Sequence, residues 1–282
     1  MTVHTRGFHA VRPGEVDGLS RFCHELLTSL PRSDQRKWGE IYVRGLVSLQ
    51  GRKSIRRMAE TIVGWRAEQG LQQFVNQSTW HWDPVRRDLA RHIGSLYRPH
   101  AWAVGEVVFP KNGASSVGVA RQFAPSAGRL LNCQLGLAMF AVGHAGAAPV
   151  DWRLLLPPNW DADDGLRASA HVPAGERRQE RWQAVLSLVD EMTRGWQLPP
   201  QPVVVDARHG VHVEPLLAGL EERGVRYVVQ VTQETAAALS AEPEYPLVAP
   251  SGVPAPRAGG GAVMANWWAV ENGARQPSRF VV

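Results

Sequence analysis

Residues 201–231 read QPVVVDARHGVHVEPLLAGLEERGVRYVVQV, with apolar runs at 203–205 and 227–231 around an amphipathic stretch. The pattern predicts a strand that ends at Asp206, a helix over about 214–223, and a second strand. Strand–helix–strand units pair their strands in parallel and cross over through the helix. The stretch therefore predicts an α/β fold.

Three earlier segments have the composition of strands: Trp102–Phe109, Ser116–Phe123 and Asn132–Val142. They are rich in Val, Leu and aromatic residues and are separated by short turns, so they predict an antiparallel meander. A long helix over Glu176–Trp196 would join this meander to the parallel strands. A meander followed by parallel strands with helices predicts an RNase H-like mixed sheet with flanking helices.

The beginning and end of the chain have other patterns. Residues 1–98 predict a helical N-terminal region, with helices over about 35–50, from Ser54, and from Asp83 onward. After about residue 240 the periodicity is lost among prolines and glycines. The expected domains are thus a helical region at 1–98, an RNase H-like core at 99–240, and a loop-rich tail with one or two edge strands at 241–282.

Composition limits the class of protein. The chain has 31 Lys and Arg, of which 28 are Arg, against 26 Asp and Glu, and a pI near 9.7. Arginine suits phosphate oxygens, which allows a nucleic-acid partner, although GC-rich coding produces the same bias. Two distant cysteines and the lack of a signal-peptide-like run predict a reduced, cytoplasmic protein. No apolar stretch approaches the length of a membrane span, so a membrane-spanning protein is excluded.

Asp206 is the most specific candidate for a functional residue, because ligands of open α/β sheets bind at the carboxyl ends of strands. Capping of the following turn is the alternative role for this residue. Glu106 in the first predicted strand is the second carboxylate, and the two could share a divalent metal, although Glu106 taken alone is better explained as an exposed strand position. His209 and His212 could join the site or lie in a solvated loop.

Polar residues inside the predicted strands need partners. Arg121 and Gln122, and Asn132 and Gln134 on either side of Cys133, could line a pocket, bind a strand of nucleic acid, or lie at an exposed sheet edge. Cys133 is expected to be a small core residue.

Two blocks of the helical region read Gly-Arg-Lys-Ser at 51–54 and LQQFVNQSTW at 71–80. They resemble Glu-Arg-Lys-Ser and Leu-Gln-His-Phe-Val-Ser-Gln-Ser-Pro-Trp of bacterial DDE-type insertion-sequence transposases, and blocks similar to that family extend over about residues 45–232. The most specific match is Ser116–Gln122 followed by Asn132–Gln134. The other blocks are Phe109–Lys111, Leu154–Pro157 with Trp160, and Val204–Val228.

In that family two Asp and one Glu hold two divalent metals for phosphodiester chemistry, so the resemblance implies Mg²⁺ or Mn²⁺. Asp206 aligns with the second Asp, and Glu106 aligns with the first, beside Gly105 in place of an acid. The run that carries the third acid does not occur before Val282, and Glu271 has a different context. The resemblance therefore implies a C-terminally shortened relative with an incomplete acidic triad and weak or absent metal binding.

Two functional hypotheses follow. The first is a degenerate or domesticated transposase-like pseudoenzyme that binds DNA or another partner; nuclease or strand-transfer activity is not expected without the full triad. Its basic surface is predicted from a set of cations whose alternative role is a solvated helical face: Arg52, Lys53, Arg56, Arg57, Arg86, Arg87, Arg91 and Arg121.

The second hypothesis is an enzyme that uses the former metal cleft on a small-molecule substrate, with Glu106, Asp206, His209 and Arg121 as acid, base or anchors. An unselected pseudogene product is disfavoured because the core periodicity is intact. The sequence leaves open the ligand, any DNA site, and whether a second copy of the chain forms a homo-oligomer.

Overall fold

The structure, a computed structural model, describes residues 13–64, 67–144, 146–240, 264–271 and 274–281. The chain divides into two compact units, Met1–His92 and Ile93–Val282, and each is described by itself. The three-part division expected from the sequence stays a prediction, and residues 241–263 of its third part lie outside the described residues.

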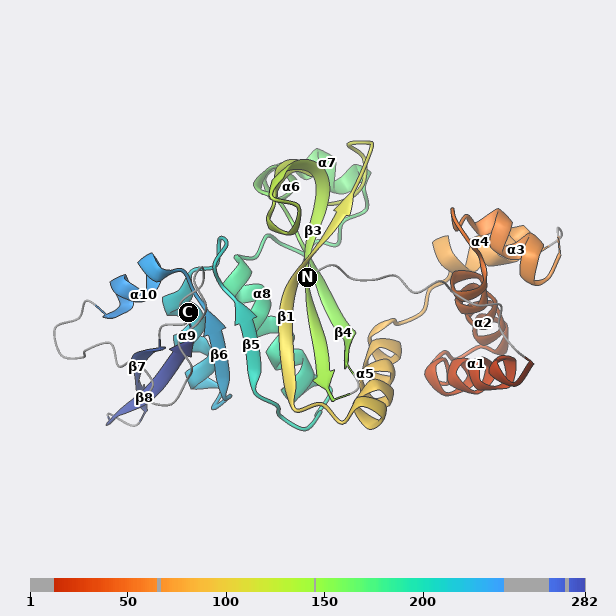
Figure 1. The fold of residues 1–282 in the computed structure, drawn as a ribbon. Helices are drawn as coiled ribbons and strands as arrows, with labels where there is room; N and C mark the ends of the chain where they lie inside the picture. Colours follow the sequence, from red (N-terminus) through yellow and green to blue (C-terminus); the bar gives the residue numbers. More distant parts are fainter. Residues whose placement is uncertain (1–12, 65–66, 145, 241–263, 272–273, 282) are drawn as a thin grey trace. The chain divides into compact units, whose positions relative to one another are not determined.

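Helices fill the described part of Met1–His92, at the red and orange end of the colour bar in Figure 1. The predicted start at Ser54 is confirmed, because its Oγ accepts the backbone N–H of Arg57 at 3.3 Å and caps the following helix. The elements are α1 (Pro13–Leu26), α2 (Ser33–Ser48), α3 (Ile55–Ile62), α4 (Glu68–Asn76) and the start of α5 (Asp83–Tyr97).

Two apolar clusters hold these helices together. Ile41, Met58 and Leu71 join α2, α3 and α4, and Cys23 of α1 lies in a second cluster with Phe74 of α4. These residues form the apolar stripes of amphipathic helices, so burying them leaves the charged faces in solvent.

A mixed sheet dominates Ile93–Val282 (Figure 1). The strand order is β2-β3-β1-β5-β6-β8-β7, and β4 pairs with β3. β1 pairs with β3 in antiparallel and with β5 in parallel, as an RNase H-like sheet requires. The strands are β1 (Ala101–Pro110), β2 (Ala120–Ala124), β3 (Arg129–Gly143), β4 (Gly146–Leu155), β5 (Val203–Asp206), β6 (Tyr227–Gln230), β7 (Met264–Glu271) and β8 (Ala274–Val281).

The predicted three-strand meander is wrong. β3 pairs with β1 along one edge and with β2 and then β4 along the other, whereas the meander assumed β1 beside β2. Residues 116–119 are not strand, because Gly118 has φ +75° and turns the chain before β2. β4 was not predicted at all.

Helices α8 and α9 pack together behind the sheet in Figure 1, where α8 contacts β3 and β4 and α9 contacts β7. The helix predicted from Glu176 begins instead at Arg181. The backbone N–H of Glu180 donates to Gln183 Oε1 at 2.9 Å, and this bond caps the start of the helix.

None of the helices in the described part of the chain has both the length and the apolar character needed to span a membrane. The helical elements are η2 (Pro125–Ala127), α6 (Pro158–Ala162), α7 (Asp164–Ser169), α8 (Arg181–Asp190), the π-helical turn η3 (Glu191–Gly195), α9 (Val213–Glu222) and α10 (Gln233–Ser240).

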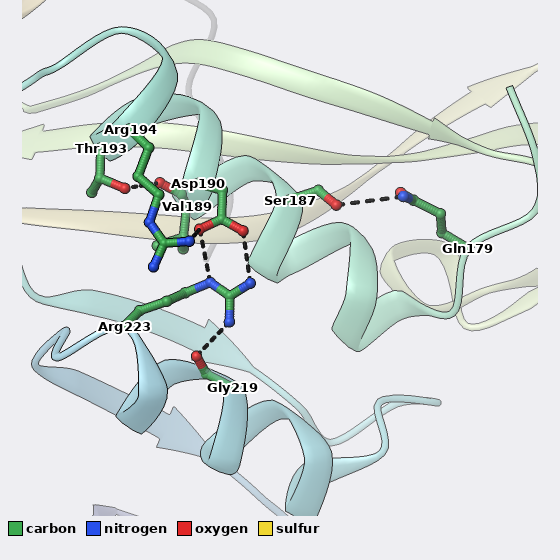
Figure 2. Close-up of polar contacts among 8 residues, drawn as sticks. All are labelled: Gln179, Ser187, Val189, Asp190, Thr193, Arg194, Gly219 and Arg223. Carbon is green, nitrogen blue, oxygen red and sulfur yellow. Dashed lines mark hydrogen bonds and ion pairs between the residues drawn. The ribbon is translucent and has the colours of Figure 1, made fainter. Parts of the chain in front are cut away.

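A hydrogen-bonded clamp joins α8 to the end of α9 (Figure 2). Arg223 donates from Nε and Nη2 to the two carboxylate oxygens of Asp190, at 2.9 and 2.7 Å, and from Nη1 to the Gly219 carbonyl at 2.7 Å. Arg194 adds an ion pair to Asp190 at 3.4 Å. The clamp fixes α8 and with it the side chains that α8 presents to the sheet.

Alternation along the strands gives the sheet a covered face and an open face. On the covered face, toward α8, Trp102 and Val205 are each 2% exposed. On the open face, Phe109, Trp152 and Val204 are 45%, 54% and 36% exposed. The face on which a residue lies therefore decides whether it meets α8 or solvent.

Candidate functional site

Asp206 ends β5 at the carboxyl edge of the sheet. Arg208 donates to both of its carboxylate oxygens, Nε to Oδ1 at 2.9 Å and Nη2 to Oδ2 at 2.7 Å, and its backbone N–H adds a bond to Oδ1 at 3.1 Å. The Arg208 guanidinium holds the pKa of Asp206 below its ordinary value, although partial burial acts in the opposite direction. Asp206 is therefore an ionised carboxylate that already has a counter-ion.

Glu106 lies on β1 and pairs with Arg181, the first residue of α8. Arg181 donates from Nη2 and Nε to Glu106 Oε2 at 2.9 and 3.3 Å. The Glu106 side chain is 14% exposed, and no donor among the described residues reaches its buried Oε1 atom. A buried acceptor without a donor is costly, so this oxygen is an unsatisfied position inside the protein.

A pocket of about 260 Å³ lies at this edge of the sheet. Leu137, Val185 and Val205 form part of an apolar wall, and the charged and polar lining residues lie beside it. Of the sequence-predicted site residues, Glu106, Asp206 and His209 line the pocket. Arg121 lies on β2 and is not among the described lining residues, and His212 is exposed at the start of α9. Ser126, Arg181 and Arg208 complete the polar lining.

Strand register separates the two carboxylates. Val104 of β1 is paired with Val205 of β5, so the next position, Gly105, lies beside Asp206, and Glu106 is one residue further. Because successive side chains point to opposite faces, Asp206 shares the open face with Gly105, whereas Glu106 points to the covered face and reaches α8.

A divalent cation needs several oxygen ligands directed to one point. Within the described residues, no group of three or more His, Cys, Asp or Glu side chains is placed to hold a metal ion. Both oxygens of Asp206 and one of Glu106 accept hydrogen bonds from arginine. Alternation along β1 and β5 assigns the two residues to different faces of the sheet, although both line the pocket. The residues as they stand do not fit the metal, and the metal site at Glu106 and Asp206 stays a prediction that this geometry opposes.

The polar residues of β2 and β3 have structural partners. Asn132 donates to the carbonyls of Lys111 and Gly113 at 2.8 and 3.1 Å, and Gln134 donates to the Val117 carbonyl at 2.6 Å. Gln122 donates to the Cys133 carbonyl at 2.9 Å. The block most similar to the transposases thus fastens the loop between β1 and β2 onto β3.

Cys133 is a core residue, as the sequence predicted. Its side chain is fully buried, and this burial, helped by the nearby negative charge of Glu106, raises the pKa of its thiol. A nucleophilic cysteine needs the opposite shift, so Cys133 has no features of a catalytic thiol.

The predicted cations around α3 are exposed, and Lys53, Arg56 and Arg57 also bond to neighbouring groups of the protein. Arg56 forms an ion pair with Glu60 at 2.8 Å, Arg57 donates to the Arg52 carbonyl at 2.9 Å, and Lys53 donates to the Leu46 carbonyl. All of these residues retain solvent-facing charge.

The cations of α5 are paired with acids of the same helix, and Arg86 also lies over the Trp82 ring at 4.5 Å. Arg121 is exposed on β2, in the other unit. The ion pairs are Arg86–Asp83 at 3.1 Å, Arg87–Asp88 at 3.4 Å and Arg91–Asp88 at 3.9 Å.

The family model described as DDE superfamily endonuclease matches residues 25–276. The chain belongs to this family. Its fold is the RNase H-like mixed sheet expected for a DDE-type transposase relative. A solved structure described as Mos1 transposase paired-end complex with left transposon end is similar at 12% identity and a TM-score of 0.26, covering 80% of this chain. This chain spans 61% of the length of that one, and no curated protein matches it.

Proposed function

We propose that this DDE-superfamily member binds duplex DNA through Met1–His92 and does not cut it. The supporting observation is the distribution of charge between the two units. Met1–His92 has 15 Lys and Arg against 9 Asp and Glu, a net charge of +6, whereas Ile93–Val282 has 16 against 17, a net charge of −1. The whole basic excess thus belongs to the helical unit, and a GC-rich coding bias would have spread it over both.

The second half of the proposal concerns chemistry. Cutting by a DDE-type site depends on carboxylates that share metal ions. Here Asp206 and Glu106 each have an arginine partner, and they point to different faces of the sheet. A relative of this kind would bind DNA, or compete for it, without cutting it.

Fluorescence anisotropy of the whole chain with a labelled duplex, over a series of salt concentrations, tests the binding. For Arg52→Gln with Lys53→Gln, we expect weaker binding and a salt slope reduced by up to about 2, because each phosphate contact contributes about 0.9 to the slope. The matched control removes two exposed charges from the other unit, Arg129→Gln with Arg177→Gln.

Equal losses in the two double variants would contradict the assignment of binding to Met1–His92. Absence of salt-sensitive binding in the wild type would contradict DNA binding itself. Incubation of supercoiled DNA with Mg²⁺ and the wild-type chain tests the non-catalytic half, and nicking that depends on Asp206 would overturn it.

The second candidate function is an enzyme or binding protein for a small molecule in the 260 Å³ pocket. The specific observation in its favour is the unpartnered Oε1 of Glu106, which a hydrogen-bond donor of a ligand would satisfy. Thermal-shift measurement against a panel of small amines and amides, with Glu106→Gln as the comparison, tests it. Stabilisation that survives in Glu106→Gln would contradict a role for this carboxylate.

A further inference from the structure

The row of residues around Asp206 on the open face crosses three neighbouring strands. Asp206 is in register with Gln230 of β6 on one side. On the other side the β1–β5 ladder ends at Val104 and Val205, and continuing its register by one residue brings Gly105 beside Asp206. Residues in register on parallel strands project to the same face. A second carboxylate able to share a cation with Asp206 would therefore stand at position 105, and not at Glu106.

Neither space nor backbone conformation requires glycine at position 105. A Cβ atom there would lie 3.5 Å from Phe140 Cε2, an ordinary contact, with nothing closer. The φ angle of Gly105 is not among the positive values seen in the described residues. The row therefore lacks a side chain at position 105, although the space there would accommodate one.

Arg208 supplies a positive charge at the same place. Its guanidinium binds both oxygens of Asp206 in the two-pronged geometry typical of strong arginine–carboxylate pairs. It comes from a position two residues along the chain, so the cation is part of the protein and does not depend on metal concentration.

We infer that Gly105 withholds the second carboxylate of a cation site at the ends of β1 and β5, and that Arg208 takes the place of the cation against Asp206. Glu106, in this assignment, is not a displaced metal ligand but the anchor of α8 through Arg181. The inference deepens the non-catalytic half of the proposed function. It is independent of DNA binding, which belongs to the other unit.

Isothermal titration with Mn²⁺ separates the two assignments. In Gly105→Asp with Arg208→Ala, two carboxylates share the open face, and we expect one Mn²⁺ to bind at least tenfold more tightly than to the wild type. The double variant Arg181→Gln with Arg208→Ala frees Glu106 and Asp206 from their arginine partners but keeps Gly105. We expect no gain in Mn²⁺ affinity for this variant. Addition of Asp206→Asn to the first variant should abolish the gain.

Gain in the Arg181→Gln double variant, or gain that survives Asp206→Asn, would overturn the inference. Failure of a folded Gly105→Asp double variant to bind Mn²⁺ would overturn it as well. Circular dichroism establishes the folding of each variant, and the DNA anisotropy assay on the same samples reports separately on Met1–His92.

A thiol pair keeps the test decisive if the added carboxylate prevents folding. Gly105→Cys with Asp206→Cys places two thiols on one face, and we expect one Cd²⁺ with a thiolate charge-transfer band above the background of Cys23 and Cys133. Glu106→Cys with Asp206→Cys places them on opposite faces, and we expect only the wild-type background. Equal Cd²⁺ binding by the two pairs would contradict the assignment of position 105.

Discussion

The covered and open faces of the sheet carry the same kinds of residue with opposite consequences. Trp102 and Trp152 are both strand tryptophans, yet one is 2% and the other 54% exposed. Glu106 and Asp206 are both carboxylates paired with arginine, yet Glu106 anchors a helix while Asp206 meets solvent at 42% exposure. A residue's type is thus a poor guide to its role until the face on which it lies is known.

The largest expected difference between the faces is in stability. Trp102→Ala should lower the free energy of unfolding by about 3–5 kcal/mol, because it leaves a cavity at a fully buried site. Trp152→Ala should cost less than about 1 kcal/mol, since its ring is half in water. Urea unfolding followed by hydrogen exchange of the β3 amides measures both, and similar losses would show that the open face is buried in solution.

A smaller effect is expected from the clamp that holds α8 on the covered face. Arg223→Met removes both bonds to Asp190 and leaves that partly buried carboxylate with Arg194 alone, so we expect a loss of about 1–3 kcal/mol. Arg226→Met, an exposed arginine three residues away, is the matched control and should be nearly neutral. Equal effects in urea unfolding would mean that the clamp contributes little.

The sequence predicted most of the fold because its strands are continuous apolar runs. β5 was predicted at its observed bounds. Of the one or two edge strands expected near the end of the chain, β7 lies at the edge of the sheet, whereas β8 lies between β6 and β7. β4 was missed because it contains Pro149, Asp151 and Arg153, and residues of these types are uncommon inside β-strands. Arg153 is accommodated by Glu191 at 2.7 Å, a partner that folding supplies and that the local sequence does not show.

The candidate site was predicted only in part, for a similar reason. Glu106 and Asp206 were found as carboxylates near strand ends, but the face of each depends on the register of β1 against β5, which neither strand encodes alone. Arg181 is 75 residues from Glu106 and left no signal. Arg208 did leave one, because an arginine two residues after a carboxylate on a turn can fold back onto it.

The smallest expected effect concerns the acid sensitivity of Asp206 on the open face. Arg208 lowers the pKa of Asp206 in the folded chain, so the pair stabilises the fold above the ordinary carboxyl pKa of about 4, and this contribution is lost as the pH falls through the lower folded pKa. The pair is exposed, so its contribution at neutral pH should be under about 1 kcal/mol and should shrink further in high salt.

Urea unfolding at pH 6 and pH 3 should therefore show a slightly smaller acid-induced loss in Asp206→Asn than in the wild type. Arg208→Ala should behave like Asp206→Asn, because either change removes the same pair. Asp164→Asn, an exposed acid at the start of α7, should leave the pH dependence closer to that of the wild type. If Asp206→Asn retained the full wild-type dependence, Arg208 would not act as the counter-ion of Asp206, and the open face would have to hold this carboxylate in some other way.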